Sequence, residues 1–556
     1  MNENSPRSLK MANFLINRFR RIFLGSFGGL YLFYGCANMQ APTGGPKDTT
    51  PPKIVKETPV NLTRNFSASK IEIEFDKFVK LKDEFSEISI SPAIDKMPVF
   101  KAHKKILDIK LEQAFEKNTT YTINFGKAIV DVNEGNVFKN YSYVFSTGDH
   151  LDSLSISGNV KSILTGTPLK DVIVFILPTK QDSLFGKKKA SVFTSTDSAG
   201  NFMLKNLKAD MYRIYALKKA AGGERIYNSN TDEIGFLRDS LALNKSVNDI
   251  ELNVFKEAPA KLRRLSDKIE ADGRISLVFN KPITELRIID PLSLDQKKSI
   301  ELGSKKDSAF VWLPELTFDS LKIEASDKNR SRDTITLNRG KKDTYNRSVI
   351  VYSDNLLSGG KLKPRSELRL TTSSPVAGFD ITKMSLLQDS VPVQGFEVLR
   401  DPVSARKFVF KFAWRPKKSY VLSLLDGSFT DIFGMKSMVH TQKLMLDSED
   451  NYGDFSLSVK VPDTSKSYLI QCLNEKDIVL RTDIVSNNKV IKYSTYPVGK
   501  YHIRVIYDVN KNGEWDSGNV LQRLQPENIW NLDKIISLRA NWEIEESLII
   551  PAAVDQ

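Results

Sequence analysis

Residues 508–516, near the C-terminus, carry the side chains whose types and spacing most clearly fit ligand chemistry. Side chains with oxygen atoms stand at positions one, three, five and nine of this segment, and Gly513 stands at position six. Calcium-binding loops begin with the same pattern, in which a glycine permits the sharp turn and position seven contributes its backbone carbonyl. The sequence therefore predicts a weak calcium site, whose ligands are Asp508, Asn510, Asn512, Glu514 and Asp516.

A plain turn between two strands is the other interpretation of these residues. A full calcium loop ends in a bidentate acid at position twelve, which here is Asn519. Residues 501–507 alternate as a strand does, unlike the helix that enters such a loop, and Asn512-Gly513 is typical of a tight hairpin. With only two carboxylates, calcium would bind at ~10⁻⁴ to 10⁻³ M. Both interpretations stay open, the turn is favoured, and no other cofactor is predicted.

Cys36 is the second residue with a predicted chemical role, the attachment of lipid. An apolar run over residues 22–34 ends at Gly35-Cys36, which is the order of a secretory signal when basic residues come first. About a dozen apolar residues are too few to span ~30 Å of hydrocarbon as a helix. We therefore predict that residues 1–35 are a removable signal peptide, whose basic residues are Arg7, Lys10, Arg18, Arg20 and Arg21.

The glycine before Cys36 resembles the lipobox of bacterial lipoproteins, in which a diacylglycerol is attached to the thiol and the signal is cut away. Phe33 and Tyr34 depart from that pattern, which more often has Leu and a small residue there. The resemblance implies an acylated Cys36, with palmitate-type chains. Residues 36–52 are rich in Pro, Gly and small polar residues, so we predict a tether that reaches up to ~50 Å when extended.

Cysteine content and net charge limit the partners. Because only two cysteines are present, a lipidated Cys36 leaves Cys472 without a disulfide partner, and its strand-like surroundings predict a small buried hydrophobic residue. The formal net charge of +14 is spread along the chain. Its longest basic cluster, 187–189, lacks the interleaved aromatic residues of a nucleic-acid platform. We predict no nucleic-acid binding, and anionic lipid headgroups suit this charge better.

Catalytic motifs are missing from the sequence. No zinc-protease motif, nucleophile elbow or phosphate-binding loop occurs outside the signal, and the histidines follow no metal or triad spacing: His103, His150, His440 and His502. Paired catalytic carboxylates have no fixed spacing, so they are not excluded. We predict that the chain is not an enzyme. An aromatic residue at every second position predicts core packing of one strand, with an exposed ligand platform as the alternative: Phe408, Phe410, Phe412 and Trp414.

Apolar and polar residues alternate with period two through the rest of the chain, as in half-buried strands. Ile71, Ile73 and Phe75 illustrate the pattern. It predicts an all-β fold of tandem β-sandwiches with almost no long helix. After the tether, the predicted units are an Ig-like domain at 53–148, a sandwich at 154–255, a third sandwich at 261–351, a second Ig-like domain at 364–447 and a C-terminal sandwich at 454–551.

Two of these units resemble known modules. Residues 53–148, with Thr58-Pro59, Ile73-Glu74-Phe75 and the loop 131–136, resemble the bacterial Ig-like domain of envelope proteins. Residues 154–255 resemble the transthyretin-like carboxypeptidase regulatory module, which is not catalytic; the turn at 197–201 is part of that likeness. Residues 431–434 match 131–135 within one residue, so 364–447 is interpreted as a second Ig-like copy.

Signal, cysteine, tether and β-modules together resemble outer-membrane lipoproteins of the Bacteroidota type. The resemblance implies an outer-membrane location. The sequence leaves the membrane face open, and we slightly favour the cell surface over the periplasmic face. The implied partners are outer-membrane lipid, bound through Cys36, and another outer-membrane protein. The leading hypothesis is a non-enzymatic scaffold that docks onto an outer-membrane complex of assembly, secretion or uptake. The alternative is a surface adhesin or a glycan-binding module.

Overall fold

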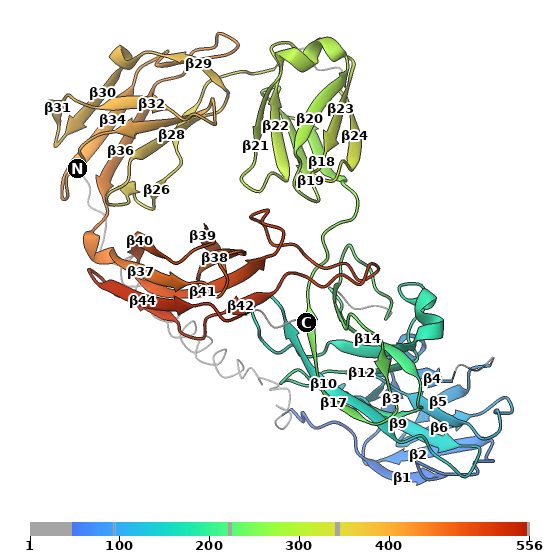
Figure 1. Ribbon diagram of the computed structural model, residues 1–556. Helices are drawn as coiled ribbons and strands as arrows, with labels where there is room; N and C mark the ends of the chain where they lie inside the picture. Colours follow the sequence, from blue (N-terminus) through green and yellow to red (C-terminus); the bar gives the residue numbers. More distant parts are fainter. Residues whose placement is uncertain (1–46, 93, 95, 221–224, 340–344, 553–556) are drawn as a thin grey trace, which may run out of the picture.

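The computed structural model describes residues 47–92, 94, 96–220, 225–339 and 345–552. Strands account for 49% and helices for 4% of the structure, which confirms the predicted all-β fold. Five β-sandwiches follow one another along the chain (Figure 1): domain 1 (54–146), domain 2 (154–254), domain 3 (264–338), domain 4 (349–446) and domain 5 (452–550). The described helices are short: α2 (Glu84–Glu87), η1 (Thr179–Leu184), η2 (Leu292–Lys297), η3 (Ile381–Lys383) and η4 (Glu449–Asn451).

Domain 1 consists of two sheets and a two-stranded ribbon. The sheets have the orders β1-β2-β6-β5 and β4-β7-β9, and β3 pairs with β8. Ile71, Ile73 and Phe75, which alternate along β2, are fully buried between the sheets. The strands are β1 (Ile54–Thr58), β2 (Lys70–Phe75), β3 (Val79–Leu81), β4 (Ser89–Ser91), β5 (Val99–His103), β6 (Ile106–Lys110), β7 (Thr120–Asn124), β8 (Ile129–Asp131) and β9 (Ser142–Ser146).

Domain 3 repeats the strand order of domain 1. Its sheets are β18-β19-β22-β21 and β20-β23-β24, and they enclose a core of their own. The strands are β18 (Arg264–Ile269), β19 (Ile275–Phe279), β20 (Glu285–Asp290), β21 (Ser299–Leu302), β22 (Ser308–Trp312), β23 (Ser320–Ser326) and β24 (Arg332–Asn338).

Domain 4 has the same order again, with β25-β28-β33-β32 facing β26-β27-β36-β34-β30-β31, and with β29 paired to β35. Phe408 and Phe410 are fully buried in its core and Phe412 and Trp414 pack against it, which supports core packing for the aromatic stripe. The strands are β25 (Val351–Ser353), β26 (Leu356–Leu357), β27 (Lys361–Leu362), β28 (Leu368–Thr372), β29 (Val376–Phe379), β30 (Met384–Gln388), β31 (Val391–Val393), β32 (Glu397–Arg400), β33 (Lys407–Lys411), β34 (Ser419–Leu424), β35 (Phe429–Asp431) and β36 (His440–Leu446).

The boundary between domains 3 and 4 differs from the predicted one. The sequence placed residue 351 at the end of the third unit and residue 364 at the start of the fourth. In the structure, Val351 begins β25, which pairs with β28, and Val349 and Val351 are buried in the core of domain 4. The alternating pattern fades between these strands because β25, β26 and β27 have only two or three residues each.

Domains 2 and 5 share a second strand order. In domain 2, β13-β10-β17 faces β12-β11-β14-β15, and in domain 5, β40-β37-β44 faces β39-β38-β41-β42; in each, the first and last strands are parallel neighbours. The strands are β10 (Leu154–Ser162), β11 (Ile173–Pro178), β12 (Val192–Ser195), β13 (Asn201–Leu207), β14 (Met211–Lys218), β15 (Glu233–Phe236), β16 (Leu241–Ala242), β17 (Val247–Val254), β37 (Tyr452–Lys460), β38 (Ser467–Asn474), β39 (Val479–Val485), β40 (Lys489–Pro497), β41 (Gly499–Asp508), β42 (Ile529–Asn531), β43 (Ile536–Leu538) and β44 (Glu543–Ile549).

Domain 1 covers the free edge of β12 in domain 2. The amide of Asn140 donates to the carbonyl of Ser195 and accepts from its N–H, both at 3.1 Å, and the amide of Asn124 donates to the carbonyl of Phe193 at 2.6 Å. An unpaired strand edge invites pairing with other chains. Here side chains of domain 1 supply the missing hydrogen bonds, so the first two domains form a continuous unit.

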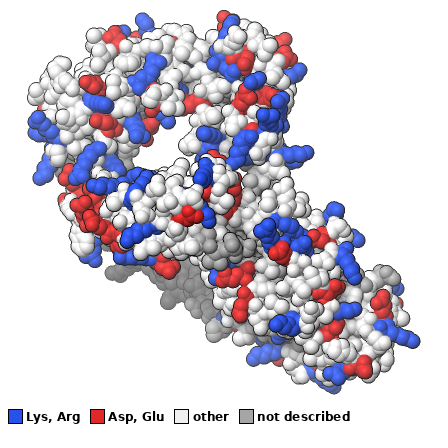
Figure 2. Space-filling model, viewed as in Figure 1, with Lys and Arg blue, Asp and Glu red and all other residues white. Residues whose placement is uncertain are grey.

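The C-terminal half of the chain turns back on itself. Figure 1 shows domains 3 and 4 side by side, and domain 5 lying between domain 4 and domain 2. Figure 2 shows an opening that domains 3, 4 and 5 surround. Domain 4 contacts domain 3 through the ion pair of Arg406 with Glu301 at 3.4 Å and contacts domain 5 through that of Arg365 with Asp454 at 3.4 Å. Domain 5 also contacts the segment that directly follows domain 2, where the N–H of Val520 donates to Glu257, 263 positions earlier in the chain.

Candidate functional site

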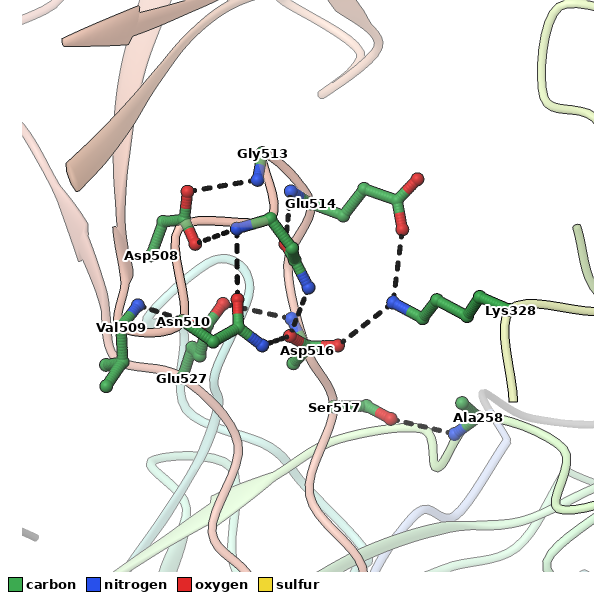
Figure 3. Close-up of polar contacts among 11 residues, drawn as sticks. Ala258, Lys328, Asp508, Val509, Asn510, Gly513, Glu514, Asp516, Ser517 and Glu527 are labelled. Atoms are coloured by element: carbon green, nitrogen blue, oxygen red, sulfur yellow. Dashed lines mark hydrogen bonds and ion pairs between the residues drawn. The ribbon is translucent and has the colours of Figure 1, made fainter. Parts of the chain in front are cut away.

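The predicted calcium residues lie in a long loop, residues 509–528, between β41 and β42. This loop is also where domain 5 meets domains 2 and 3 (Figure 3). Asp508 ends β41 with its side chain buried, and its carboxylate accepts the N–H groups of Asn512 and Gly513, each at 3.0 Å. Gly513 has a φ of +77°, which a glycine adopts at little cost. These bonds fix the first turn of the loop.

Asp516 is the acceptor of the next turn. The side-chain amides of Asn510 and Asn512 both donate to its Oδ2 atom, at 2.5 and 2.6 Å. The side-chain oxygen of Asn510 accepts the backbone N–H of Asn512, and the side-chain oxygen of Asn512 accepts the backbone N–H of Glu514. The structure thus brings the five predicted residues together, but the amide N–H groups, rather than the amide oxygens, face Asp516.

Lys328 of domain 3 reaches the same turn. Its ammonium group lies 3.4 Å from a carboxylate oxygen of Glu514 and 3.5 Å from Oδ1 of Asp516 (Figure 3). Burial works to lower the pKa of Lys328, but Asp516 and Glu514 outweigh it and raise that pKa. A positive charge from another domain is therefore already placed against the two acids.

The calcium site stays a prediction. The tight hairpin was wrong, because no short turn joins β41 to β42. Among the described residues, no group of three or more His, Cys, Asp and Glu side chains is gathered as a metal site. Asn512-Gly513 does form a turn, yet it opens a loop of some 20 residues rather than joining two strands directly. The loop is long because its second half packs against another domain.

Val520 is the apolar anchor of that second half. It is 1% exposed and belongs to a hydrophobic cluster that otherwise consists of domain 2 residues, among them Phe175, Tyr215 and Phe255. Trp515 packs against the same cluster. These residues cover the outer face of the sheet that contains β11 and β14, so that sheet is buried on both faces. The continuous apolar run at 172–177 is the sequence signal for such a sheet.

Arg523 makes the central polar contact. Its guanidinium pairs with Asp182 of η1 and donates to the hydroxyl of Tyr215 at 2.6 Å, and Tyr215 donates to Asp182 at 2.6 Å. Burial works to raise the pKa of Asp182, but the bonds from Tyr215 and Arg523 prevail and hold that pKa below its usual range. Burial also raises the pKa of Tyr215. Asp182 and Arg523 therefore form a partly buried charged pair at the edge of the apolar cluster.

Further hydrogen bonds hold the loop to domain 2 and to the linker that follows it. The N–H of Val520 donates to the buried Glu257, and the N–H of Ala258 donates to the hydroxyl of Ser517 at 2.8 Å. The side chain of Gln525 donates to the carbonyl of Phe236 at 2.7 Å. We call residues 509–528 the clasp. The sequence gives no sign of its role, because the residues that it contacts lie in another domain, far away in sequence.

Sequence comparison bears on domain 1. Residues 48–147 match the bacterial Ig-like domain. The match confirms the predicted resemblance for this domain and covers less than half of the chain. Domains 3 and 4 repeat the strand order of this domain. No curated protein matches the sequence.

Three of the solved structures that are similar to the chain share 10–11% sequence identity with it. The alignment with the Bacillus anthracis TIE protein, at 10% identity, covers 92% of this chain and 75% of that protein, with a TM-score of 0.13. The alignment with the major pilin subunit of Bacillus cereus, at 11% identity, covers 71% of this chain and 99% of the pilin, with a TM-score of 0.13. Bacteroides ovatus SGBP-B, solved with a mixed-linkage heptasaccharide, covers 61% and 86% at 10% identity, with a TM-score of 0.18. Likeness at this level does not bear on function.

The remaining predicted residues divide into two groups. Cys36, the signal and most of the tether lie outside the described residues. Cys472 is a free, fully buried cysteine in β38, as expected, and burial raises the pKa of its thiol to about 12. No helix in the described part of the chain is long and apolar enough to cross a membrane.

Proposed function

We propose that this chain is a lipid-anchored, non-enzymatic scaffold of the cell envelope that docks onto an outer-membrane protein complex of assembly, secretion or uptake. The clasp is the observation that carries the proposal. It joins domain 5 to domains 2 and 3, so the β-sandwiches form one body instead of a flexible string. A body with fixed faces binds a large partner without first losing the freedom of its own linkers.

The anchor of this scaffold is Cys36. Two acyl chains bury many CH₂ groups at ~0.8 kcal/mol each, which makes membrane attachment stable. We expect Cys36→Ser to move the protein from the membrane fraction to the soluble fraction, and the native chain to show the added mass of the lipid. Unchanged partitioning together with an unmodified mass would exclude the anchor.

Docking is tested in membranes of cells that carry the tagged chain. After mild crosslinking and gentle solubilisation, we expect one outer-membrane protein to be recovered with the native chain. The same partner should be lost with Val520→Asp, which opens the clasp, and kept with Leu521→Asp, whose side chain is 79% exposed. Equal recovery with both variants, or recovery of no outer-membrane protein, would contradict the proposal.

A further inference from the structure

A half-open cavity of about 200 Å³ lies where domain 4 meets domain 5. One wall comes from Arg365 of domain 4, and the other comes from the start of β37 and the turn at 541–543 of domain 5. Since a water molecule takes up ~30 Å³, the cavity holds about six or seven waters, or one sugar ring in their place. None of its lining residues belongs to the clasp.

Trp542 is the exposed aromatic residue in the lining of this cavity. It is 52% exposed, whereas Trp312, Trp414, Trp515 and Trp530 are buried or half-buried. Large aromatic side chains gain most from burial, so an exposed indole at a cavity wall is a surface that a ligand can cover. The guanidinium of Arg539 lies 4.9 Å from the ring centroid and covers part of the indole.

The backbone holds Trp542 in place. Its carbonyl accepts the N–H of Asp454 at 2.8 Å, and its own N–H donates to the carbonyl of Arg539 at 3.2 Å. The neighbouring Asn541 donates from its side chain to Asp450 at 2.8 Å. The indole therefore sits on a turn that is tied to β37, and a ligand would meet a preformed platform.

Polar groups of both signs surround the indole. Asp454 accepts the N–H of Thr495 at 2.6 Å and pairs with Arg365 at 3.4 Å, and Glu449 and Glu543 complete the acidic side. Because the lining carries three carboxylates and one guanidinium, an acidic ligand would be repelled on balance. A purely apolar ligand would remove water from these charges without replacing its hydrogen bonds.

We propose that this cavity binds a neutral glycan, with one pyranose ring stacked on Trp542. A pyranose presents an apolar C–H face to the indole and hydroxyl groups at its edge. The hydroxyls donate to Asp454, Glu449 or Glu543 and accept from Arg365 or Asn541. Because the cavity is open on one side, a longer chain continues into solvent. Glycan binding is separate from docking, so either activity can fail while the other remains.

The test uses the full mature chain and four neutral oligosaccharides: cellohexaose, maltohexaose, laminarihexaose and mannohexaose. We expect at least one to bind with a Kd of ~1 mM or tighter in calorimetry, and to change tryptophan fluorescence. Trp542→Ala should weaken binding by about 10-fold, which corresponds to ~1.4 kcal/mol, since the variant lacks the apolar face on which the ring stacks.

One control and one further cavity variant make the result specific. Tyr352→Ala removes another exposed aromatic side chain, outside the cavity, and should leave binding unchanged. Arg365→Ala should weaken binding at native thermal stability, because Arg365 is 64% exposed. Absence of binding by all four sugars at ~10 mM, or equal binding by native chain and Trp542→Ala, would overturn the proposal. Tighter binding of an acidic polysaccharide such as heparin than of any neutral sugar would also overturn it.

Discussion

Domains 2 and 5 have the same strand order, and in both the long loop after the third strand of the larger sheet contacts another domain. In domain 2 this loop carries Arg225, which is 3% exposed, lies 3.7 Å from the ring centroid of Phe193 and donates to the carbonyl of Glu87 in domain 1. In domain 5 it is the clasp, which inserts Val520 into a cluster of domain 2.

The two loops differ in how far they reach along the sequence. Arg225 joins domains that are already neighbours in the chain, whereas Val520 bonds to Glu257, 263 residues away. Closure entropy grows only with the logarithm of loop length, so a distant contact costs little more than a near one once its packing is good. The same loop position of this fold thus holds neighbouring domains together in domain 2 and joins distant parts of the chain in domain 5.

The largest expected effect is that of Val520→Asp. A carboxylate at this 1% exposed position would be an unpaired charge in an apolar cluster, which costs ~3–5 kcal/mol. We expect the clasp to leave domain 2, with faster hydrogen exchange in β14 and β15 and a larger radius of gyration in X-ray scattering. Leu521→Asp, one residue on and 79% exposed, should change neither. A compact Val520→Asp variant with native exchange would show that the clasp does not close the chain.

Arg225→Ala tests the shorter loop. It removes a buried cation from Phe193 and from Glu87, whose carboxylate lies 3.6 Å away, and we expect a loss of ~2–4 kcal/mol. The loss should appear as earlier unfolding of domains 1 and 2 in urea, while the radius of gyration stays native. Lys188→Ala, at an exposed position, is the control. A larger radius of gyration in Arg225→Ala would show that the domain 2 loop, like the clasp, holds the whole chain closed.

Acid should loosen the clasp. Since the folded-state pKa of Asp182 is held below its unfolded value of ~3.9, its contribution is complete above that value and is lost as pH falls through the folded pKa. Glu527 acts in the opposite sense, because burial raises its pKa. We expect scattering to show expansion below about pH 4. Asp182→Asn should lack that step, and an identical acid response in the variant would exclude Asp182.

The smallest effect is expected at Lys328, which is about half exposed. Calcium at millimolar concentration should stabilise the chain by at most ~1–2 kcal/mol, and Lys328→Ala should enlarge the shift in Tm, because the ammonium no longer competes for Asp516 and Glu514. Asp508→Ala should abolish it. If neither native chain nor Lys328→Ala responds to several millimolar calcium, the loop binds no calcium and serves only as a turn.

Alternation of apolar and polar residues was enough to predict the strands, because burial of one face of a sheet directly selects those residues. Ile71, Ile73 and Phe75 are the plain example, and they lie in the core as expected. The same pattern could not show that domain 5 repeats domain 2, because the repeated feature is the parallel pairing of the first strand with the last, which leaves no local signal.

The candidate site was predictable only in its first half. Asp508 and Gly513 indicated a turn because those residue types and spacings act locally. Val520 and Arg523 were missed because they owe their role to Phe175, Tyr215 and Asp182, which are more than 300 positions away. Leu521 and Leu524 stand beside Val520 in the sequence yet are exposed, so no local pattern shows which of these apolar residues is buried.

The parallel pairing of β10 with β17, and of β37 with β44, gives these domains a mechanical property. In such a pair the chain enters at one end of the domain and leaves at the other. Tension along the polypeptide therefore pulls the two strands past each other, and their hydrogen bonds bear the load together instead of opening one after another. A chain that is fixed at one end and pulled at the other would therefore yield first elsewhere, and domains 2 and 5 would keep their shape.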